Sequence, residues 1–271
     1  MKHWYAAAVL ILTLVAPGAH AADAQPFPHR AHFRDVPVID TEQLRRQFDG
    51  TVVVDVRSRF EYEMLHIIGA AHVPLDKERL PAAVRALRGT TDKPIVFYCN
   101  GTTCKKSYEA AELVIQAGVT NVYAYDAGID AWSRKYPELS VLLGKNPVHP
   151  SELISSESFK KRLINVPDFE ARMEQGAIVL DIRDLRQRDV MLFPMREMRA
   201  TLDDTEKLAA AVIEARRLKK TLLVYDKVGK QTRWFQYYLE QQGLKDYYFL
   251  AGGAEGYHEA KLGKNPIQIP D

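Results

Sequence analysis

Cysteine is scarce in this sequence, which has only two among its 271 residues. A small domain that depends on several disulfide bonds is therefore excluded. Net charge is also nearly absent, because 37 Lys and Arg residues are balanced by 35 Asp and Glu residues. This balance gives no electrostatic reason to expect a nucleic acid or an anionic membrane as the partner.

Long apolar runs are missing as well. The amino-terminal run, Ala6 to Ala16, has 11 residues, whereas a membrane-spanning helix needs about 20. Lys2 precedes this run, and Pro17-Gly18 and the small-residue triplet Ala19-His20-Ala21 follow it. This order is typical of a secretory signal peptide. We therefore expect residues 1–21 to be cleaved off after Ala21 and the remaining chain to act in the periplasm, without a membrane span.

What is present is typical of a globular protein, with 46% apolar and 27% charged residues. The length favours two domains of about 100–150 residues each. A weak internal duplication supports this division, because landmarks recur at offsets of 125 to 127 positions. Three segments, Val52–Arg57, Ile95–Cys99 and Gln116–Gly118, return as Ile178–Arg183, Leu222–Asp226 and Gln241–Gly243.

In each copy, short apolar runs alternate with helical patterns, which indicates an α/β fold. Val52–Val56 and Ile95–Tyr98 have no alternating polar residues, as expected of central parallel strands. Lys106–Ala117 has an apolar stripe at helical spacing and stops at Gly118. We expect two domains, each a mainly parallel sheet covered by helices on both faces. The predicted bounds are an irregular arm at 22–36, a first domain at 37–143, a linker at 144–157 and a second domain at 158–271.

The first copy resembles the rhodanese homology domain in its motifs. These are Asp55-Val56-Arg57, the segment His66–Ala71, the strand that ends at Cys99 and the closing segment Asp126–Trp132. The second copy resembles a degenerate relative, because Asp226 stands where the first copy has Cys99. The resemblance implies a sulfurtransferase in which Cys99 takes sulfane sulfur from a donor such as thiosulfate, as a persulfide, and passes it to a thiol or cyanide. It implies no organic cofactor and no metal.

The residues around Cys99 support this chemistry on their own. A cysteine at the carboxyl end of a buried parallel strand lies where α/β sheets bind ligands. The following loop and helix would supply N–H groups, a helix dipole and positive charge. We expect these to lower the pKa of Cys99 and to hold an anionic substrate. The predicted site is Cys99 as nucleophile, with a substrate-binding set of Asn100, Gly101, Thr102, Thr103, Cys104, Lys105, Lys106 and Arg57.

Simpler interpretations exist for the same residues. Cys99 is then a small buried side chain, and Lys105 and Lys106 are solvated residues of a first helical turn. Arg57 is then one partner of an ion pair with a carboxylate such as Glu61. A phosphatase site of the form Cys-x5-Arg is disfavoured, because Lys105 occupies the position that the arginine requires.

Cys104 is the other thiol of this loop. The loop is longer than its counterpart in the second copy, since Cys99 to Gly118 spans 19 positions and Asp226 to Gly243 spans 17. Three roles are open for Cys104. It closes a reversible disulfide with an oxidised Cys99, forms a permanent disulfide, or is inert.

Aspartate cannot carry sulfane sulfur, so we expect the second copy to be structural or regulatory. Asp226 would accept hydrogen bonds from N–H groups of its own loop and keep that loop closed. A Cu(I) site at Met191, Met195 and Met198 is disfavoured by their irregular spacing. Two functions remain as alternatives to sulfur transfer: a non-enzymatic binding protein that meets a protein partner through its second domain, and a thiol-disulfide redox protein that uses Cys99 and Cys104.

Overall fold

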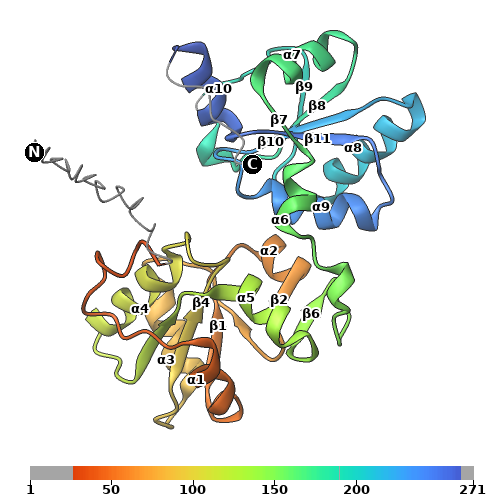
Figure 1. Ribbon diagram of the computed structural model, residues 1–271. Helices are drawn as coiled ribbons and strands as arrows, with labels where there is room; N and C mark the ends of the chain where they lie inside the picture. Colours follow the sequence, from red (N-terminus) through yellow and green to blue (C-terminus); the bar gives the residue numbers. More distant parts are fainter. Residues whose placement is uncertain (1–26, 189, 264–271) are drawn as a thin grey trace, which may run out of the picture.

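The computed structural model describes residues 27–188 and 190–263. It divides into two α/β halves, one above the other in Figure 1, and the chain passes between them just before α6 (Ser156–Lys160). Each half contains a sheet of parallel strands flanked by helices. This arrangement confirms the predicted fold class.

The first sheet has the strand order β3-β1-β4-β5, and all its pairings are parallel. β1 (Val52–Asp55) and β4 (Ile95–Tyr98) form its centre, between β3 (Ala71–His72) and β5 (Val122–Tyr125). All residues of β4 are buried, because apolar layers cover both faces of the sheet. The two runs predicted as central strands therefore form them, and β1 ends one residue before the predicted Val56.

Helices supply these apolar layers. α3 (Leu80–Arg88) and α4 (Lys106–Gln116) pack on the face that carries Val54 and Phe97. α1 (Thr41–Arg46) and α5 (Gly128–Lys135) pack on the opposite face, where α2 (Arg59–Met64) also contributes buried side chains. The helix predicted at Lys106–Ala117 is thus α4, which Ala117 caps before Gly118 turns the chain at φ +80°.

The second sheet has the strand order β7-β11-β10-β8-β9, again with parallel pairings only. β8 resembles β1 of the first sheet, because both end at an aspartate. β10 resembles β4, because both end at a tyrosine. The strands are β7 (Leu163–Ile164), β8 (Ile178–Asp181), β9 (Glu197–Arg199), β10 (Leu222–Tyr225) and β11 (Tyr247–Leu250), and the helices are α7 (Val166–Glu174), α8 (Thr205–Leu218), α9 (Thr232–Gln241) and α10 (Gly253–Lys261).

The remaining regular elements are short. β2 (Leu65–Ile67) and β6 (Ser140–Leu142) form a separate antiparallel pair beside the first sheet. Single 3-10 turns occupy Phe48–Gly50, Pro137–Leu139, Pro150–Glu152 and Leu185–Gln187. The segment predicted as a linker, 144–157, therefore includes one of these turns and the start of α6. No helix in residues 27–188 and 190–263 is long and apolar enough to cross a membrane. The predicted signal peptide at 1–21 lies outside the described residues.

The arm that precedes the first sheet is irregular, as predicted, and its described part is fixed to the fold. Arg30 forms an ion pair with the buried Asp126 (Nε to Oδ2, 2.7 Å). Phe33 stacks on Tyr108 of α4 with ring centroids 5.1 Å apart. His29 lies with its Nε2 3.1 Å from the carbonyl oxygen of Thr103. The arm therefore reaches the loop that follows β4.

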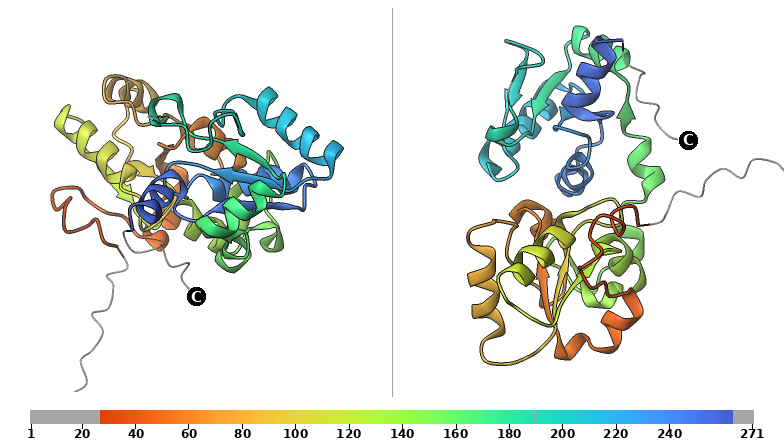
Figure 2. Two further views of the ribbon diagram at one scale, coloured as in Figure 1. Left: turned by 90° about the horizontal axis from the view of Figure 1, so that it is seen from above. Right: turned by 90° about the vertical axis from the view of Figure 1, so that its left-hand side faces the viewer.

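The two halves meet through α2 and α9, which contact each other. The right-hand view of Figure 2 shows one half above the other. Phe60 of α2 contacts Phe235 and Tyr238 of α9, with ring centroids 6.2 and 6.3 Å apart. Buried residues of both halves belong to one continuous apolar cluster. The two halves are therefore joined by direct apolar contact.

Candidate functional site

The loop after β4 lies at the carboxyl edge of the first sheet, the expected position of a ligand site in a parallel α/β fold. The start of α5 fixes its first residues. The N–H of Ile129 donates to the carbonyl oxygen of Cys99 at 3.0 Å, and the N–H of Asp130 donates to that of Asn100 at 3.3 Å. Gly128, at φ +66°, allows this approach because a Cβ there would lie 2.5 Å from the backbone nitrogen of Gly101. The loop therefore has a defined backbone path.

Cys99 is buried completely, with 0% exposure. Its Sγ lies 3.3 Å from the carbonyl oxygen of Cys104 and 3.8 Å from Oγ of Ser107. Burial raises the pKa of Cys99 well above its usual value, because the thiolate is poorly solvated there. The expected lowering of this pKa is therefore wrong: the loss of solvation outweighs the hydrogen bonds from Ser107.

Cys104 differs from Cys99 in its exposure and in the direction of its pKa shift. It is partly exposed and lines the cleft between the two halves. The neighbouring Cys99 thiol, the backbone N–H groups of Asn100 and Lys106 and the charge of Lys106 lower the pKa of Cys104 to about 6, against the opposing effect of its partial burial. Both cysteines are free thiols. The structure thus describes the loop without the permanent disulfide that was one of the three roles considered for Cys104.

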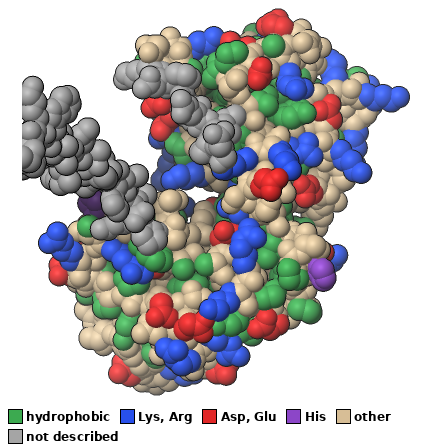
Figure 3. Space-filling model, viewed as in Figure 1, with side chains coloured by type: hydrophobic (Ala, Val, Ile, Leu, Met, Phe, Trp, Pro, Cys, Tyr) green, Lys and Arg blue, Asp and Glu red, His purple; other side chains and the backbone are tan. Residues whose placement is uncertain are grey.

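The cleft has a volume of about 560 Å³ and is bounded by loops of both halves. Figure 3 shows the hollow between the halves, with Lys and Arg side chains at its rim. The carboxylates that line it are Glu61, Glu109 and Asp226, and the basic side chains are Lys105, Lys106, Lys227, Lys230 and Arg233. Of the predicted substrate-binding set, Asn100, Thr103, Cys104, Lys105 and Lys106 line the cleft, whereas Gly101, Thr102 and Arg57 are absent from its lining.

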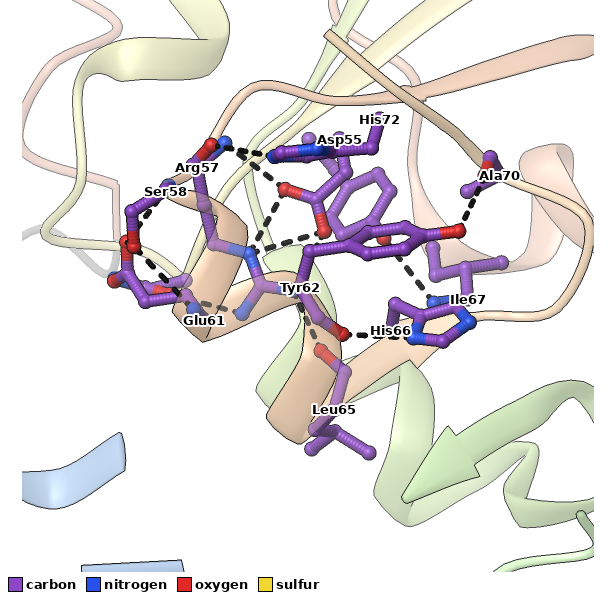
Figure 4. Close-up of polar contacts among 12 residues, drawn as sticks. Asp55, Arg57, Ser58, Glu61, Tyr62, Leu65, His66, Ile67, Ala70 and His72 are labelled. Carbon is purple, nitrogen blue, oxygen red and sulfur yellow. Dashed lines mark hydrogen bonds and ion pairs between the residues drawn. The ribbon is translucent and has the colours of Figure 1, made fainter. Parts of the chain in front are cut away.

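Arg57 is a buried structural residue and is closed off from the cleft. Figure 4 shows its guanidinium held against Asp55, with Nη2 2.6 Å from Oδ2 and both side chains at 0% exposure. Its Nη2 also donates to the carbonyl oxygen of Leu65 at 2.6 Å, and its Nη1 donates to Oδ1 of Asn100 at 3.2 Å. Its predicted place in the substrate-binding set is therefore not supported by the geometry. Its contact with Asn100 orients the loop instead.

Glu61 was the suggested carboxylate partner of Arg57, and it has other contacts. Its Oε2 accepts hydrogen bonds from the N–H and Oγ of Ser58 at the start of α2. Its Oε1 accepts one from Nδ2 of Asn100 at 2.8 Å. The side-chain amide of Asn100 is therefore held at both ends, by Arg57 and by Glu61.

The corresponding loop of the second half is closed by its own carboxylate. Asp226, 1% exposed, accepts hydrogen bonds from the backbone N–H groups of Gly229, Gln231 and Thr232. Burial raises the pKa of Asp226, and these N–H groups oppose that rise. The prediction that this aspartate holds its loop closed is confirmed.

Sequence reasoning missed the contribution of the second half to the cleft. Lys230, Arg233 and Trp234 line it, as does His29 of the arm. The internal duplication placed the two loops at equivalent positions of the two sheets, but carried no signal that the loops would face each other. Among the described ranges, no group of three or more His, Cys, Asp or Glu side chains is arranged to hold a metal ion.

Comparisons with known proteins give the following results. Residues 40–135 match the family model of the rhodanese-like domain. The chain is 35% identical over 116 residues to the tRNA uridine(34) hydroxylase of Photorhabdus laumondii, which covers 40% of this chain and 32% of that protein. Proteins of the same name from Yersinia match to the same extent. The chain thus spans about a third of the length of the curated relatives it matches.

Two solved structures are also similar. The thiosulfate sulfurtransferase of Pseudomonas aeruginosa is 18% identical and aligns with 83% of this chain and 43% of its own, at a TM-score of 0.41. The human single-domain sulfurtransferase TSTD1 is 26% identical and aligns with 37% of this chain and 97% of its own, at a TM-score of 0.32.

Proposed function

We propose that the chain is a sulfurtransferase, because residues 40–135 match the family model of the rhodanese-like domain. In this proposal, a thiol of the loop 99–105 takes sulfane sulfur from a small anionic donor such as thiosulfate and holds it as a persulfide. A thiol or cyanide then accepts the sulfur. The resemblance assigns the persulfide to Cys99.

The observation that carries this proposal is the position of the loop. The loop follows β4, one of the two central strands of the first sheet. Its Cys104 lines a cleft that five basic side chains also line. Basic side chains and helix N-termini in a partly enclosed cleft attract small anions. The hydroxylase activity named for the relatives is not part of the proposal, because the shared segment is about a third of their length.

Thiosulfate uptake tests the proposal. We expect the intact protein to gain one sulfur atom on incubation with thiosulfate, seen by mass spectrometry, and to release it to cyanide as thiocyanate. The matched control is the double variant Cys99→Ser, Cys104→Ser, which keeps the loop nearly isosteric and should gain none. A wild-type protein that takes up no sulfur would favour a non-enzymatic binding role.

The proposal includes export to the periplasm. The support is the order of Lys2, the apolar run Ala6–Ala16 and the triplet Ala19-His20-Ala21. We expect amino-terminal sequencing of protein recovered from the periplasm to begin at Ala22. Recovery of the chain with Met1 intact in a membrane fraction would contradict export with cleavage.

A further inference from the structure

The arm contacts two loops at the carboxyl edge of the first sheet, and it runs beside α4 in Figure 1. Nε2 of His29 lies 3.1 Å from the carbonyl oxygen of Thr103, in the loop after β4. Arg30 forms its ion pair with Asp126, directly after β5. We propose that Arg30 is a positioning residue, which anchors the arm across this edge and so holds the loop of Cys99 in place for sulfur transfer. This inference rests on the proposed function and adds the arm to its machinery.

Arg30 supplies the counter-charge of a buried carboxylate. Asp126 is 1% exposed, and its two oxygens accept from Nε and Nη2 of Arg30 at 2.7 and 3.1 Å. Within the part of the chain that the structure describes, no other cation forms an ion pair with Asp126. A bidentate pair of this kind fixes orientation as well as charge, and a buried carboxylate that loses its partner is strongly destabilised. The guanidinium of Arg30 is therefore held at one position, although its side chain is 45% exposed.

Tyr108 of α4 belongs to the same contact. Its hydroxyl donates to Asp126, and burial together with that carboxylate raises the pKa of Tyr108, so the hydroxyl keeps its proton. Phe33 of the arm stacks on the Tyr108 ring, with 14° between the ring planes. Tyr108 lies in the first turn of α4, which begins directly after the loop of Cys99. The arm therefore contacts both this loop and the helix that follows it.

Asp126 is linked to the loop of Cys99 through the residues that follow it in the chain. Gly128 packs against the backbone of Gly101, where a Cβ would not fit. The N–H of Ile129 donates to the carbonyl oxygen of Cys99 at 3.0 Å. A displacement of Asp126 would therefore shift the start of α5 and the first residues of the loop with it. Misplacing a reacting group by about 1 Å can cost about 10²-fold in rate.

The rest of the arm is attached to the fold by few contacts. Most residues of 28–35 are exposed, and Val36 is the first buried residue of the described chain. Segments with few buried apolar contacts open at a low cost in free energy. Loss of the Arg30 side chain should therefore release the arm and leave the first domain folded.

The second half has no carboxylate at the position equivalent to Asp126. Gly128 and Gly253 correspond, because both have a positive φ and each would place a Cβ 2.5 Å from the backbone of the loop beside it. Two residues before these glycines, the first half has Asp126 and the second has Ala251. The second loop is held by Asp226 within it. The two halves therefore fix their loops in different ways, and the first half uses the arm.

Hydrogen exchange of the loop amides tests the anchor without sulfur transfer. In Arg30→Ala we expect the amides of residues 99–105 to exchange about tenfold faster than in the wild type. Arg34→Ala is the matched control, because Arg34 lies in the same arm, donates to the carbonyl oxygen of Ala31 and forms no ion pair within the described residues. Its loop amides should exchange at the wild-type rate. Unchanged exchange in Arg30→Ala would overturn the inference.

The kinetics of thiosulfate uptake separate positioning from substrate binding. Arg30→Ala should lower the maximal rate of uptake about tenfold and leave the half-saturating concentration of thiosulfate unchanged. Unchanged uptake would overturn the inference, as would a raised half-saturating concentration at an unchanged maximal rate, which would make Arg30 a binding cation. If the wild type takes up no sulfur while exchange rises in Arg30→Ala, the proposed function fails and the anchoring of the loop stands.

A double variant separates anchoring from charge balance. If Arg30 only neutralised Asp126, the combination Arg30→Ala, Asp126→Asn would restore wild-type exchange and uptake. We expect this double variant to remain as slow as Arg30→Ala, because nothing then holds the arm. Arg30→Lys keeps the charge without the bidentate geometry and should recover part of the maximal rate. Full recovery by the double variant would overturn the positioning role.

Discussion

Gly128→Ala is expected to reduce thiosulfate uptake at least about tenfold, because a group misplaced by an ångström can cost that much or more. The new Cβ would lie 2.5 Å from the nitrogen of Gly101, 2.6 Å from the carbonyl oxygen of Cys99 and 2.7 Å from the carbonyl carbon of Asn100. All three are backbone atoms, so the loop itself has to move. We expect a loss of about 3 kcal/mol in the free energy of unfolding, from overpacking and left-handed backbone strain together.

Gly118→Ala is the matched control for this prediction. Gly118 has a similar positive φ of +80°, but a Cβ there meets nothing within 4 Å. It should cost about 1 kcal/mol of stability through backbone strain alone and leave thiosulfate uptake unchanged. Urea unfolding and the sulfur-uptake rate measure the two effects separately. Full uptake by Gly128→Ala would show that the path of the loop does not govern the chemistry.

Asp55→Asn should cost about 3–5 kcal/mol of the free energy of unfolding, since it leaves a buried guanidinium without its counter-charge. Asp55 and Arg57 are both at 0% exposure, and their side chains lie 2.6 Å apart (Nη2 to Oδ2). The carboxylate of Asp55 also accepts from the backbone N–H of Arg57 at 2.9 Å. The amide of asparagine would keep the shape and lose the charge, so the measured cost isolates the electrostatic contribution.

Glu63→Gln provides the comparison for the buried pair. Glu63 and Arg59 form an ion pair at 2.7 Å in which the side chains are 48% and 75% exposed. Exposed pairs of this kind contribute up to about 1 kcal/mol. Chemical denaturation should therefore separate the two variants clearly. Similar unfolding free energies for Asp55→Asn and Glu63→Gln would mean that the buried carboxylate is not needed to balance Arg57.

The strands and α4 were accessible from the sequence because their signals are local. Val52–Val54 and Ile95–Tyr98 are uniformly apolar, as expected of strands buried on both faces of a sheet. The end of α4 was visible at Gly118, whose positive φ suits glycine. In these cases the residues that decide the structure lie within one turn or one strand of the feature predicted.

The pKa values of the loop cysteines depend on contacts with residues that are distant in the sequence. Cys99 is buried because α5 closes over the loop through Gly128, 29 positions later in the chain. The arm adds a contact between Arg30 and Asp126, which are 96 positions apart. The argument that backbone N–H dipoles lower a thiol pKa therefore holds for Cys104, which lines the cleft. It fails for Cys99, which is buried.

The cleft could not be predicted from the sequence, because it depends on how the two halves are placed relative to each other. The contact between Phe60 and Phe235 helps to set this placement. Both are apolar residues in amphipathic helices, and their sequence pattern is the same as that of residues packed inside one domain. Sequence analysis therefore identified the loop and its lysines, whereas Lys230 and Arg233 became visible only with the structure.

The carboxylate of Asp226 acts as an intramolecular ligand for the N–H groups of its own loop. A tethered group has an effective concentration set by the backbone and independent of the medium. The N–H groups of the second loop are thus occupied at every concentration of free anion, and an added dianion would meet a negative charge already in place. Occupancy of the first loop, whose residues carry no such tethered carboxylate, would instead follow the supply of donor. Added anions should therefore compete with Asp226 in the second loop and with no such carboxylate in the first.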